Sequence, residues 1–478
     1  MDHRIDSTVQ IIGCTQKPDQ ITAAAARIST TTGDCLSIFT HSVDTQKNQA
    51  LIQKVLASGH RTIIEHIYFN LAFQNVSAYA EQFMLEFRLA SFTVKSRRYV
   101  DFSNMGFVVP AFIGQNDSPL PDAAKLETRY REHMSFLFQE YEAFCEAGIP
   151  KEDARFLLPY CYRSNFYCTV NARELYHILS SMLHGKGKDH TEIHALGMQL
   201  YNQAADLCPY IFRPLADETD GTEQKYEKLA QLLQKTTHDP ILAPRTGGIS
   251  VELLSYPKNP EYAAAKACLC AYTNIATEKI DRMLENRELT EQVITAILAD
   301  RRPRELEQLS YTFRINGISL ACVTHLTRHR MQSILIPPFY DVCDCERYMI
   351  PETVKADPAQ KQRYQNAYRK TKELYDLLTS YGLHKQETAY LYLSGSVIDL
   401  TTTINARELL VFLSLRTCNR AQWETRNVAM LILNRLREVS PALFCHFGPS
   451  CFVTGRCPEG KKTCGQFHEV QKQFSAPN

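Results

Sequence analysis

The sequence lacks a net charge of either sign, a long apolar run and an apolar N-terminal segment. Its 53 basic and 52 acidic residues leave a formal charge of +1 at pH 7. The balanced charge does not favour nucleic acid as a partner, and any anion site must come from the local placement of cations. No apolar run reaches the roughly 20 residues that span a bilayer, so no membrane partner is expected. The N-terminus, MDHRIDSTVQIIG, has no signal-peptide core, and we expect a cytoplasmic protein.

Cysteine is plentiful, but its pattern does not suggest a disulfide framework. Sixteen cysteines are scattered along 478 residues, and without an export signal most should be reduced. Six lie in apolar surroundings and are expected to be small core residues: Cys14, Cys145, Cys161, Cys168, Cys208 and Cys322. A chain of this length exceeds what one hydrophobic core supports, so at least two domains are predicted.

The chain repeats itself at an interval of about 240 residues. The strongest pair is TVNAREL at 169–175 and TINAREL at 403–409, in which six of seven residues match. Upstream, residues 9–25 align with residues 251–267. Matching blocks in the same order, with offsets that drift by about ten residues, predict a duplicated domain rather than a many-unit array.

The repeats set the expected domain organisation. The first repeat spans residues 1–217, a polar linker spans 218–249, the second repeat spans 250–444 and a Cys-rich tail spans 445–478. We use the names first repeat and second repeat for these two segments.

Within a repeat, strand-like and helix-like periodicities alternate. In the first repeat we expect a strand at 67–78, a helix from there through Arg88, and a long amphipathic helix at 123–147. The predicted fold class is therefore α+β, or mixed α/β, with a β-sheet packed against long helices in each repeat.

Three ionisable side chains, Arg328-His329-Arg330, follow one another in the second repeat. Cations at a helix end, followed by a hydroxyl, suit a pyrophosphate or a flavin. Alone, the run is also what a solvated basic helix end looks like. Its context carries more information, because an Arg-Tyr pair, the NAR motif and the sequence AQWE follow in a fixed order.

This order of motifs resembles the flavin-dependent thymidylate synthases, whose signature is Arg-His-Arg, seven residues, a Ser and an Arg-Tyr pair. The first repeat keeps Ser96 and Arg98-Tyr99 but reads EFR at 86–88, where the family has Arg-His-Arg. The second repeat keeps Arg-His-Arg but has Pro338 in place of the Ser. The resemblance covers most of both repeats.

Two further family positions divide in the same way. The family's Ala-Arg is retained as Ala154-Arg155 in the first repeat, whereas the second repeat has Ala389 at that arginine. The arginine that ends the NAR helix is Arg416 in the second repeat and Met182 in the first. Each repeat has therefore kept one half of the family's ligand-binding set. Random decay would scatter the losses over both halves.

In the family, each site lies between subunits of a homotetramer. The resemblance thus implies a composite site made from both repeats, and a homodimer that imitates the tetramer. The residues it implies for binding dUMP are Ser96, Arg98, Arg155, Arg328 and Arg416. The first three would hold the phosphate, for which bidentate Arg bonds are well suited.

The resemblance also implies contacts with FAD. They are Arg328, His329, Arg330, Asn405, Arg407, Asn171, Arg173 and His60. Arg416, Arg328 and His60 are the catalytic candidates, since cations stabilise negative charge that develops on the pyrimidine. Simpler alternatives stay open: the NAR asparagines as helix caps, His60 as a surface histidine, and Arg155 and Arg416 as salt-bridge partners. Which NAR motif serves the site is also open.

The implied reaction is the reductive methylation of dUMP to dTMP, with FAD as cofactor and NADPH and methylene-tetrahydrofolate as co-substrates. Two departures keep alternatives open. The family's pyrimidine-contacting Gln is His325 here, and its acidic residue before the Ser position is Val94 in the first repeat and Ile336 in the second. The chain could modify another pyrimidine nucleotide, or bind flavin and nucleotide without catalysis.

The tail carries four cysteines within twenty residues: Cys445, Cys451, Cys457 and Cys464. Four thiols can satisfy a tetrahedral Zn²⁺, and a structural zinc is a candidate cofactor. The spacing differs from a tight CxxC knuckle, so an iron–sulfur cluster and plain reduced cysteines remain alternatives.

Overall fold

The computed structural model describes most of the chain, namely residues 6–114, 118–217, 228–229, 232–233, 248–342 and 345–475. The residues fall into two compact units. Unit 1 contains residues 1–243 and 344–396, and unit 2 contains residues 244–343 and 397–478. The predicted linker lies almost entirely outside the described residues.

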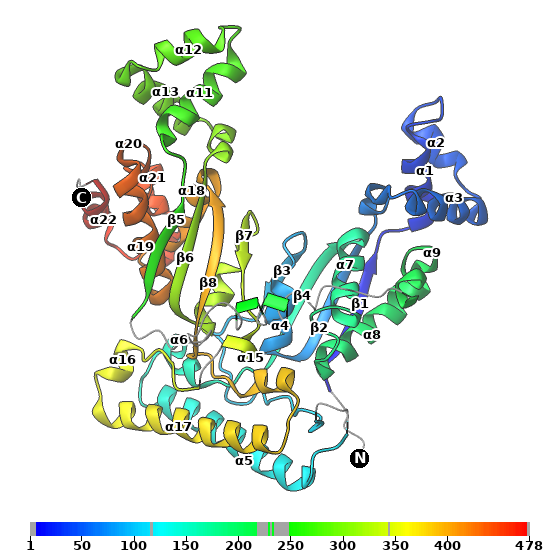
Figure 1. Cartoon of the computed structure of the whole chain (residues 1–478), viewed down its shortest axis with the longest axis vertical. Helices are drawn as coiled ribbons and strands as arrows, with labels where there is room; N and C mark the ends of the chain where they lie inside the picture. The colour runs from blue at the N-terminus through cyan, green and yellow to red at the C-terminus, as the bar shows by residue number, and fades with distance from the viewer. Residues whose placement is uncertain are drawn as a thin grey trace. The chain divides into compact units, whose positions relative to one another are not determined.

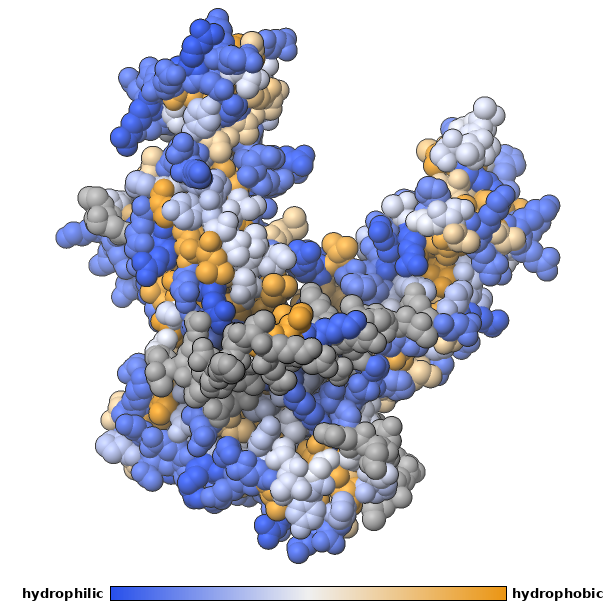
Figure 2. All heavy atoms as spheres, viewed as in Figure 1, coloured by the Kyte–Doolittle hydropathy of each residue, from blue (hydrophilic) through white to orange (hydrophobic). Residues whose placement is uncertain are grey.

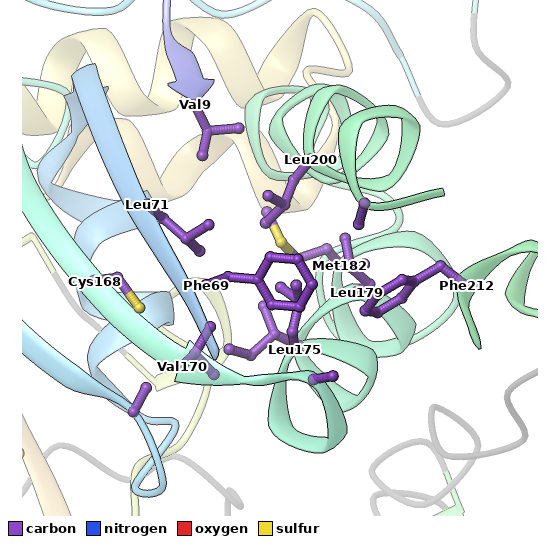
Figure 3. Close-up of a cluster of buried hydrophobic side chains, with 14 of the residues drawn as sticks. Val9, Phe69, Leu71, Cys168, Val170, Leu175, Leu179, Met182, Leu200 and Phe212 are labelled. Carbon is purple, nitrogen blue, oxygen red and sulfur yellow. The ribbon is translucent and has the colours of Figure 1, made fainter. Parts of the chain in front are cut away.

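Unit 1 is built on a four-stranded antiparallel sheet with the strand order β1-β2-β4-β3 (Figure 1). The strands are β1 (Thr8–Cys14), β2 (Tyr68–Ser77), β3 (Ser91–Val94) and β4 (Arg163–Asn171). The helices α7 (Ala172–Leu183) and α8 (Thr191–Leu207) pack beside it. Figure 3 shows Phe69 of β2, Leu175 of α7 and Leu200 of α8 meeting in one buried cluster, which is the core of this sheet.

The other elements of unit 1 include 3₁₀ helices, written η. They are α1 (Pro18–Arg27), α2 (Cys35–His41), α3 (Thr45–Ala57), η1 (Arg61–His66), α4 (Ala78–Leu85), α5 (Ala123–Glu146), α6 (Lys151–Ala154), η2 (Arg155–Leu157), α9 (Pro209–Phe212), η3 (Arg213–Asp217), α16 (Glu352–Lys355), α17 (Pro358–Ser380) and η5 (Lys385–Leu391).

Unit 2 has a second four-stranded antiparallel sheet, ordered β5-β6-β8-β7. Its strands are β5 (Ser250–Ser255), β6 (Ser310–Ser319), β7 (Gln332–Leu335) and β8 (Val397–Asn405). The remaining elements are α11 (Pro260–Tyr272), α12 (Thr277–Met283), α13 (Arg287–Ala299), η4 (Arg304–Gln308), α14 (Leu320–Leu326), α15 (Phe339–Val342), α18 (Ala406–Arg416), α19 (Trp423–Val439), α20 (Pro441–Phe444), α21 (Ser450–Thr454), η6 (Gly460–Lys462) and α22 (Phe467–Ser475).

The two sheets share register as well as order. Tyr68 pairs with Asn171 in unit 1, and the equivalent Ser310 pairs with Asn405 in unit 2. Both second strands have a bulge at one position, where Asn75 and Gly317 have φ of 55° and 69°. Because a one-residue slip would turn every side chain to the other face, shared register is strong evidence of common descent. The predicted fold class is confirmed.

Local signals explain where the elements of a repeat begin and end. The strand expected at 67–78 is β2, which gives way to α4 because the Ser77 hydroxyl accepts the Ala80 N–H at 2.9 Å and caps that helix. The helix expected to reach Arg88 ends at Leu85, so that prediction was three residues too long. The long helix expected at 123–147 is α5.

The compact units do not follow the repeats. The helices α16, α17 and η5 belong to the second repeat by sequence but lie in unit 1. There α17 packs along α5 (Figure 1). Arg363 makes two hydrogen bonds with the Glu140 carboxylate, at 3.1 and 3.2 Å, and the Tyr368 hydroxyl donates to the Phe156 carbonyl at 2.9 Å.

Equivalent residues of the two repeats pair with each other inside unit 1. The Tyr160 N–H donates to the Tyr392 carbonyl, and the Ser394 N–H donates to the Leu158 carbonyl, both at 2.8 Å. Residues 158–160 are equivalent to 392–394, so the two bonds are related by a local twofold axis. Reciprocal pairing of one segment with its own counterpart is the rule at the contact of two identical subunits. Here one chain makes it internally.

Polar side chains dominate the surface of the long helices. Over α5 and α17, Figure 2 shows mainly hydrophilic residues with small apolar areas between them. Among the described residues, no helix has both the length and the hydropathy needed to cross a membrane.

Candidate functional site

The loop after β3 carries Ser96 and Arg98 on either side of a buried anchor. That anchor is Arg97, whose Nη2 lies 2.6 Å from Glu81 Oε1, with both side chains buried. The other Glu81 oxygen accepts the Ser164 hydroxyl at 2.5 Å. Through the Glu81 carboxylate, Arg97 and Ser164 link this loop to β4. Ser96 and Arg98 stay partly exposed beside it.

Arg98 and Arg155 meet at Glu152, in the short helix α6. The Nε of Arg98 donates to Glu152 Oε2 at 2.7 Å, and the Nε of Arg155 donates to the Glu152 carbonyl at 3.1 Å. The backbone N–H of Arg98 donates to Ser96 Oγ at 3.3 Å. The structure therefore brings together all three residues predicted for the nucleotide phosphate. Sequence reasoning missed Glu152, which organises them.

The Arg-His-Arg run follows α14, beyond its C-cap at Thr327. Arg328 and Arg330 are exposed, whereas His329 between them is 5% exposed. Cations are favoured at this end of a helix. Two exposed guanidinium groups are donors that an anionic pyrophosphate takes, so the residues fit FAD in their chemistry. The interpretation as a solvated helix end applies at most to the two arginines, since the histidine points inward.

His329 links a carboxylate to a guanidinium. Its Nδ1 lies 3.1 Å from Glu408 Oε1, and Arg416 Nε donates to its Nε2 at 3.0 Å. Because arginine can only donate, Nε2 must accept, and the ring proton belongs on Nδ1 facing Glu408. Burial lowers the pKa of His329, while the hydrogen bond to Glu408 opposes that shift. The ring is therefore neutral, and it orients Arg416.

The NAREL motif supplies three parts of this arrangement at the start of α18. The Asn405 side chain accepts the Glu408 N–H at 2.9 Å and caps the helix. Arg407 pairs with Glu307, and Glu408 holds His329. Arg416 ends the same helix, where its Nη2 also reaches the His325 carbonyl at 3.5 Å. One helix thus fixes both the acceptor and the guanidinium that flank the ring.

The first repeat keeps the asparagine cap but lacks the contacts that join Glu408, His329 and Arg416 in the second repeat. Asn171 accepts the Glu174 N–H at 2.9 Å, and Arg173 pairs with Glu65 at 2.5 Å. Both asparagines therefore cap their helices, and a contact of either with FAD stays a prediction.

In the first repeat, apolar residues stand at the positions equivalent to His329 and Arg416. Phe87 stands where the second repeat has His329, and its ring contacts those of Phe83 and His177. Met182 stands where the second repeat has Arg416, and it is buried. The histidine and the arginine were thus lost together.

His60 is exposed at the start of η1, and its backbone N–H donates to the Val55 carbonyl at 3.2 Å. This position agrees with the alternative that His60 is a surface histidine. A role beside the flavin stays a prediction.

Three of the four cysteines predicted to bind metal come together. Cys451, Cys457 and Cys464 line one cavity in unit 2, and the fourth cysteine in its wall is Cys418. Cys445 is exposed and is not among the lining residues. Burial, followed by the negative charges of Cys418, Cys457 and Cys464, raises the pKa of the Cys451 thiol. Across the described ranges, no three His, Cys, Asp or Glu side chains form a group suited to a metal ion.

A protein-family model matches the chain twice. Its description is "Thymidylate synthase complementing protein", and it matches residues 10–210 and 252–442. The two matches fall on the two repeats predicted above.

Similar single proteins match about half of the chain and nearly all of themselves. The flavin-dependent thymidylate synthase of Clostridium tetani is 30% identical over 247 residues, which is 48% of this chain and 98% of that protein. That of Geobacter sulfurreducens is 31% identical and covers 47% and 98%, respectively. That of Thermococcus onnurineus is 34% identical and covers 45% and 91%. Each relative thus corresponds to about one repeat.

Among solved structures, the chain is similar to the UMP/dUMP methylase PolB from Streptomyces cacaoi bound with 5-Br dUMP. The TM-score is 0.40 at 25% identity, over 45% of this chain and 96% of that one.

Proposed function

This chain belongs to the flavin-dependent thymidylate synthase family, and we propose that it methylates dUMP to dTMP with FAD as its cofactor. The observation that carries the proposal is the set of contacts around His329. In these contacts, the neutral His329 ring accepts a hydrogen bond from Arg416 and faces Glu408. The exposed Arg328 and Arg330 are its neighbours in the sequence. A guanidinium held in place before the reaction can stabilise negative charge on the pyrimidine without reorganisation.

The proposed role of unit 1 is to bind the nucleotide phosphate. Ser96 and Arg98 are partly exposed and offer a hydroxyl and a guanidinium group, and the buried Arg155 lies beside them at Glu152. Arginine suits a phosphate because its planar fork can form two parallel hydrogen bonds. Arg98 already directs its Nε toward Glu152, which restricts the directions in which its remaining donors point.

We propose that the two half-sets serve one composite site. The support is their complementary retention: unit 1 keeps the phosphate residues, and unit 2 keeps Arg328 and Arg416. The reciprocal bonds between residues 158–160 and 392–394 support an internal imitation of a subunit contact. A homodimer of this chain would then correspond to the homotetramer that the family resemblance implies.

Bound FAD would supply the redox chemistry, with NADPH as the proposed reductant and methylene-tetrahydrofolate as the proposed carbon donor. In unit 2, Arg328 and Arg330 would hold the anionic part of the cofactor, and Arg407 lies on the helix that Glu408 ties to the same turn. The chain's own residues would bind and orient the nucleotide and the cofactor, and their cations would offset negative charge.

A different pyrimidine nucleotide is the second candidate substrate, and His325 is the observation that favours it. This residue replaces the family's pyrimidine-contacting Gln, is buried, and accepts from Arg416 through its carbonyl. A change of side chain so close to Arg416 can alter which base is accepted.

The test uses the purified full chain with measurement of bound FAD, native mass and, with methylene-tetrahydrofolate present, dUMP-dependent NADPH oxidation. We expect bound FAD, a dimeric mass and product dTMP, and we expect Arg416→Ala to abolish turnover. Met182→Leu, which changes the equivalent position of the first repeat and keeps its buried volume, is the control and should leave turnover intact. Oxidation that UMP or dCMP supports and dUMP does not would favour the second candidate. A protein that binds no FAD would refute the proposal.

A further inference from the structure

Four cysteines from two segments of unit 2 line one cavity of about 50 Å³. Cys418 lies in the turn between α18 and α19. Cys451 lies in α21, and Cys457 and Cys464 lie in the loop between α21 and α22. The tail is thus folded against the end of α18 and is part of unit 2.

Three hydrogen bonds fix the segments that carry these cysteines. Ser450 Oγ donates to the Ser414 carbonyl at 3.1 Å, and Asn419 Nδ2 donates to Gln466 Oε1 at 2.7 Å. Gln471 Nε2 donates to the Cys451 carbonyl at 2.8 Å. The cavity is therefore held by bonds that do not involve the thiols, as expected of a prepared ligand site.

The loop between the last cysteines is shaped by glycine. Gly455, Gly460 and Gly465 have φ of 71°, 53° and 74°, which is the left-handed region that other residues adopt at a cost. Gly465 directly follows Cys464, and Gly455 precedes Cys457 by two residues. The chain therefore turns directly after Cys464 and shortly before Cys457.

The arrangement of the thiols distinguishes between kinds of occupant. A single Zn²⁺ needs four sulfurs at about 2.3 Å from one centre, which leaves no space between them. Within the described residues, no such convergent group is found. The four cysteines instead line a cavity of about 50 Å³, which a group of several atoms can occupy. We propose that Cys418, Cys451, Cys457 and Cys464 hold an iron–sulfur cluster, for which four cysteine thiolates are the usual ligand set.

The surroundings suit a negatively charged cluster. The backbone N–H of Arg420 donates to Cys418 Sγ at 3.5 Å, and hydrogen bonds to the ligating sulfurs are a main way in which proteins stabilise such clusters. Arg456, Lys461 and Lys462 lie between the last three cysteines, against one acidic residue, Glu459. These cations offset part of the charge of the four thiolates.

The cluster would fix the end of the helix that carries Arg416. Cys418 follows Arg416 by two residues, and the Thr417 carbonyl between them accepts from Arg426 Nε of α19 at 3.2 Å. A rigid ligand at Cys418 restricts the last turn of α18. The role assigned to the cluster is structural, and it requires no electron transfer.

The test is elemental analysis of the full chain purified without oxygen. We expect roughly two to four iron atoms per chain with equal acid-labile sulfide, and an electron paramagnetic resonance signal after reduction by dithionite. Cys418→Ser should lose most of the iron and sulfide, whereas Cys445→Ser, at the exposed cysteine outside the cavity, should retain both. Cys457→Ser, in the exposed loop, gives a second loss variant should Cys418→Ser fail to fold.

Three results would overturn the inference. One is stoichiometric zinc without sulfide. Another is a chain without metal that remains unchanged when iron and sulfide are supplied under reducing conditions. The third is the reverse ligand pattern, in which Cys445→Ser loses iron and Cys418→Ser keeps it. Iron and sulfide contents do not depend on turnover, so failure here leaves the proposed dUMP methylation standing.

Discussion

Arg416 Nε donates to His329 Nε2 across 3.0 Å, so the guanidinium at the end of α18 is held by a ring from the turn after α14. The opposite ring nitrogen faces Glu408, which lies in the first turn of the same α18. In the first repeat, Phe87 and Met182 occupy the two positions, while the carboxylate remains as Glu174. The joint loss of ring and guanidinium identifies His329 as a positioning residue for Arg416.

The first prediction is that His329→Phe, which copies the first repeat, lowers kcat for dUMP by roughly 10- to 100-fold. The reason is that Arg416 loses its acceptor and its fixed orientation, and small misplacements of a catalytic group are costly. The melting temperature should change little, because a phenylalanine fills the equivalent position of unit 1. Steady-state kinetics with parallel calorimetry would check this. Equal kcat in variant and parent would contradict it.

The second prediction concerns pH. Burial holds the pKa of His329 below its ordinary value of about 6.5. When the pH falls through that lowered value, Nε2 gains a proton and can no longer accept from Arg416. Turnover should therefore be constant near neutrality and fall on the acid side, below about pH 6.5. The kcat profile of His329→Gln should lack this acid limb. An acid limb of the same shape in both proteins would assign it to another group.

The third prediction tests the phosphate half of the site. Arg98→Lys keeps the charge but loses the fork that Glu152 orients, so the KM for dUMP should rise about tenfold, equivalent to about 1.4 kcal/mol. Arg347→Lys, at the equivalent position of the second repeat, is the matched control and should have little effect. Deoxyuridine, which has no phosphate, should bind both variants and the parent alike. A selective loss of deoxyuridine binding would place Arg98 elsewhere.

The fourth prediction ranks the two NAR motifs. Glu408 ties the NAR helix of the second repeat to the Arg-His-Arg turn, whereas Phe87 leaves the first without that tie. Arg407→Ala should therefore lower the FAD content, and Arg173→Ala should not. The comparison is well matched, because each arginine pairs with an acidic residue of the preceding 3₁₀ helix, Glu307 or Glu65. Equal losses of FAD would show that both motifs serve the cofactor.

Local patterns in the sequence predicted the duplication, the strands and the capped NAR helices, because these depend on neighbouring residues. The NAREL match even contained Glu408, but a cap was sufficient to explain the motif, so its contact with His329 went unnoticed. Glu152 had no counterpart in the known signature. The contacts of Glu408 with His329 and of Glu152 with Arg98 each join residues that lie far apart in the sequence. A single glutamate is also too common in proteins to stand out as a site residue.

Cys418 and α17 were missed for a related reason. Cys418 lies outside the dense cysteine group, and only the packing of α21 against α18 brings it to the cavity. Likewise, the amphipathic pattern of α17 shows that one face is buried but not that α5 of the other repeat buries it. The periodicity of a helix gives its apolar face and not its partner.

The last prediction concerns the contact between α5 and α17. Nε2 of His133 lies 2.9 Å from Thr371 Oγ1, and burial, followed by the charge of Lys370, lowers the pKa of His133 to about 4. The unfolded chain, with a pKa near 6.5, binds more protons between these values. The helix pair should thus have its full stability above pH 6.5 and lose on the order of 3 kcal/mol as the pH falls toward 4. Hydrogen exchange in peptides of α5 and α17 would measure this locally, after correction for the intrinsic exchange rate. His133→Gln, which keeps a hydrogen-bonding group without titrating, should reduce the pH dependence; an unchanged dependence would assign it to other groups in unit 1.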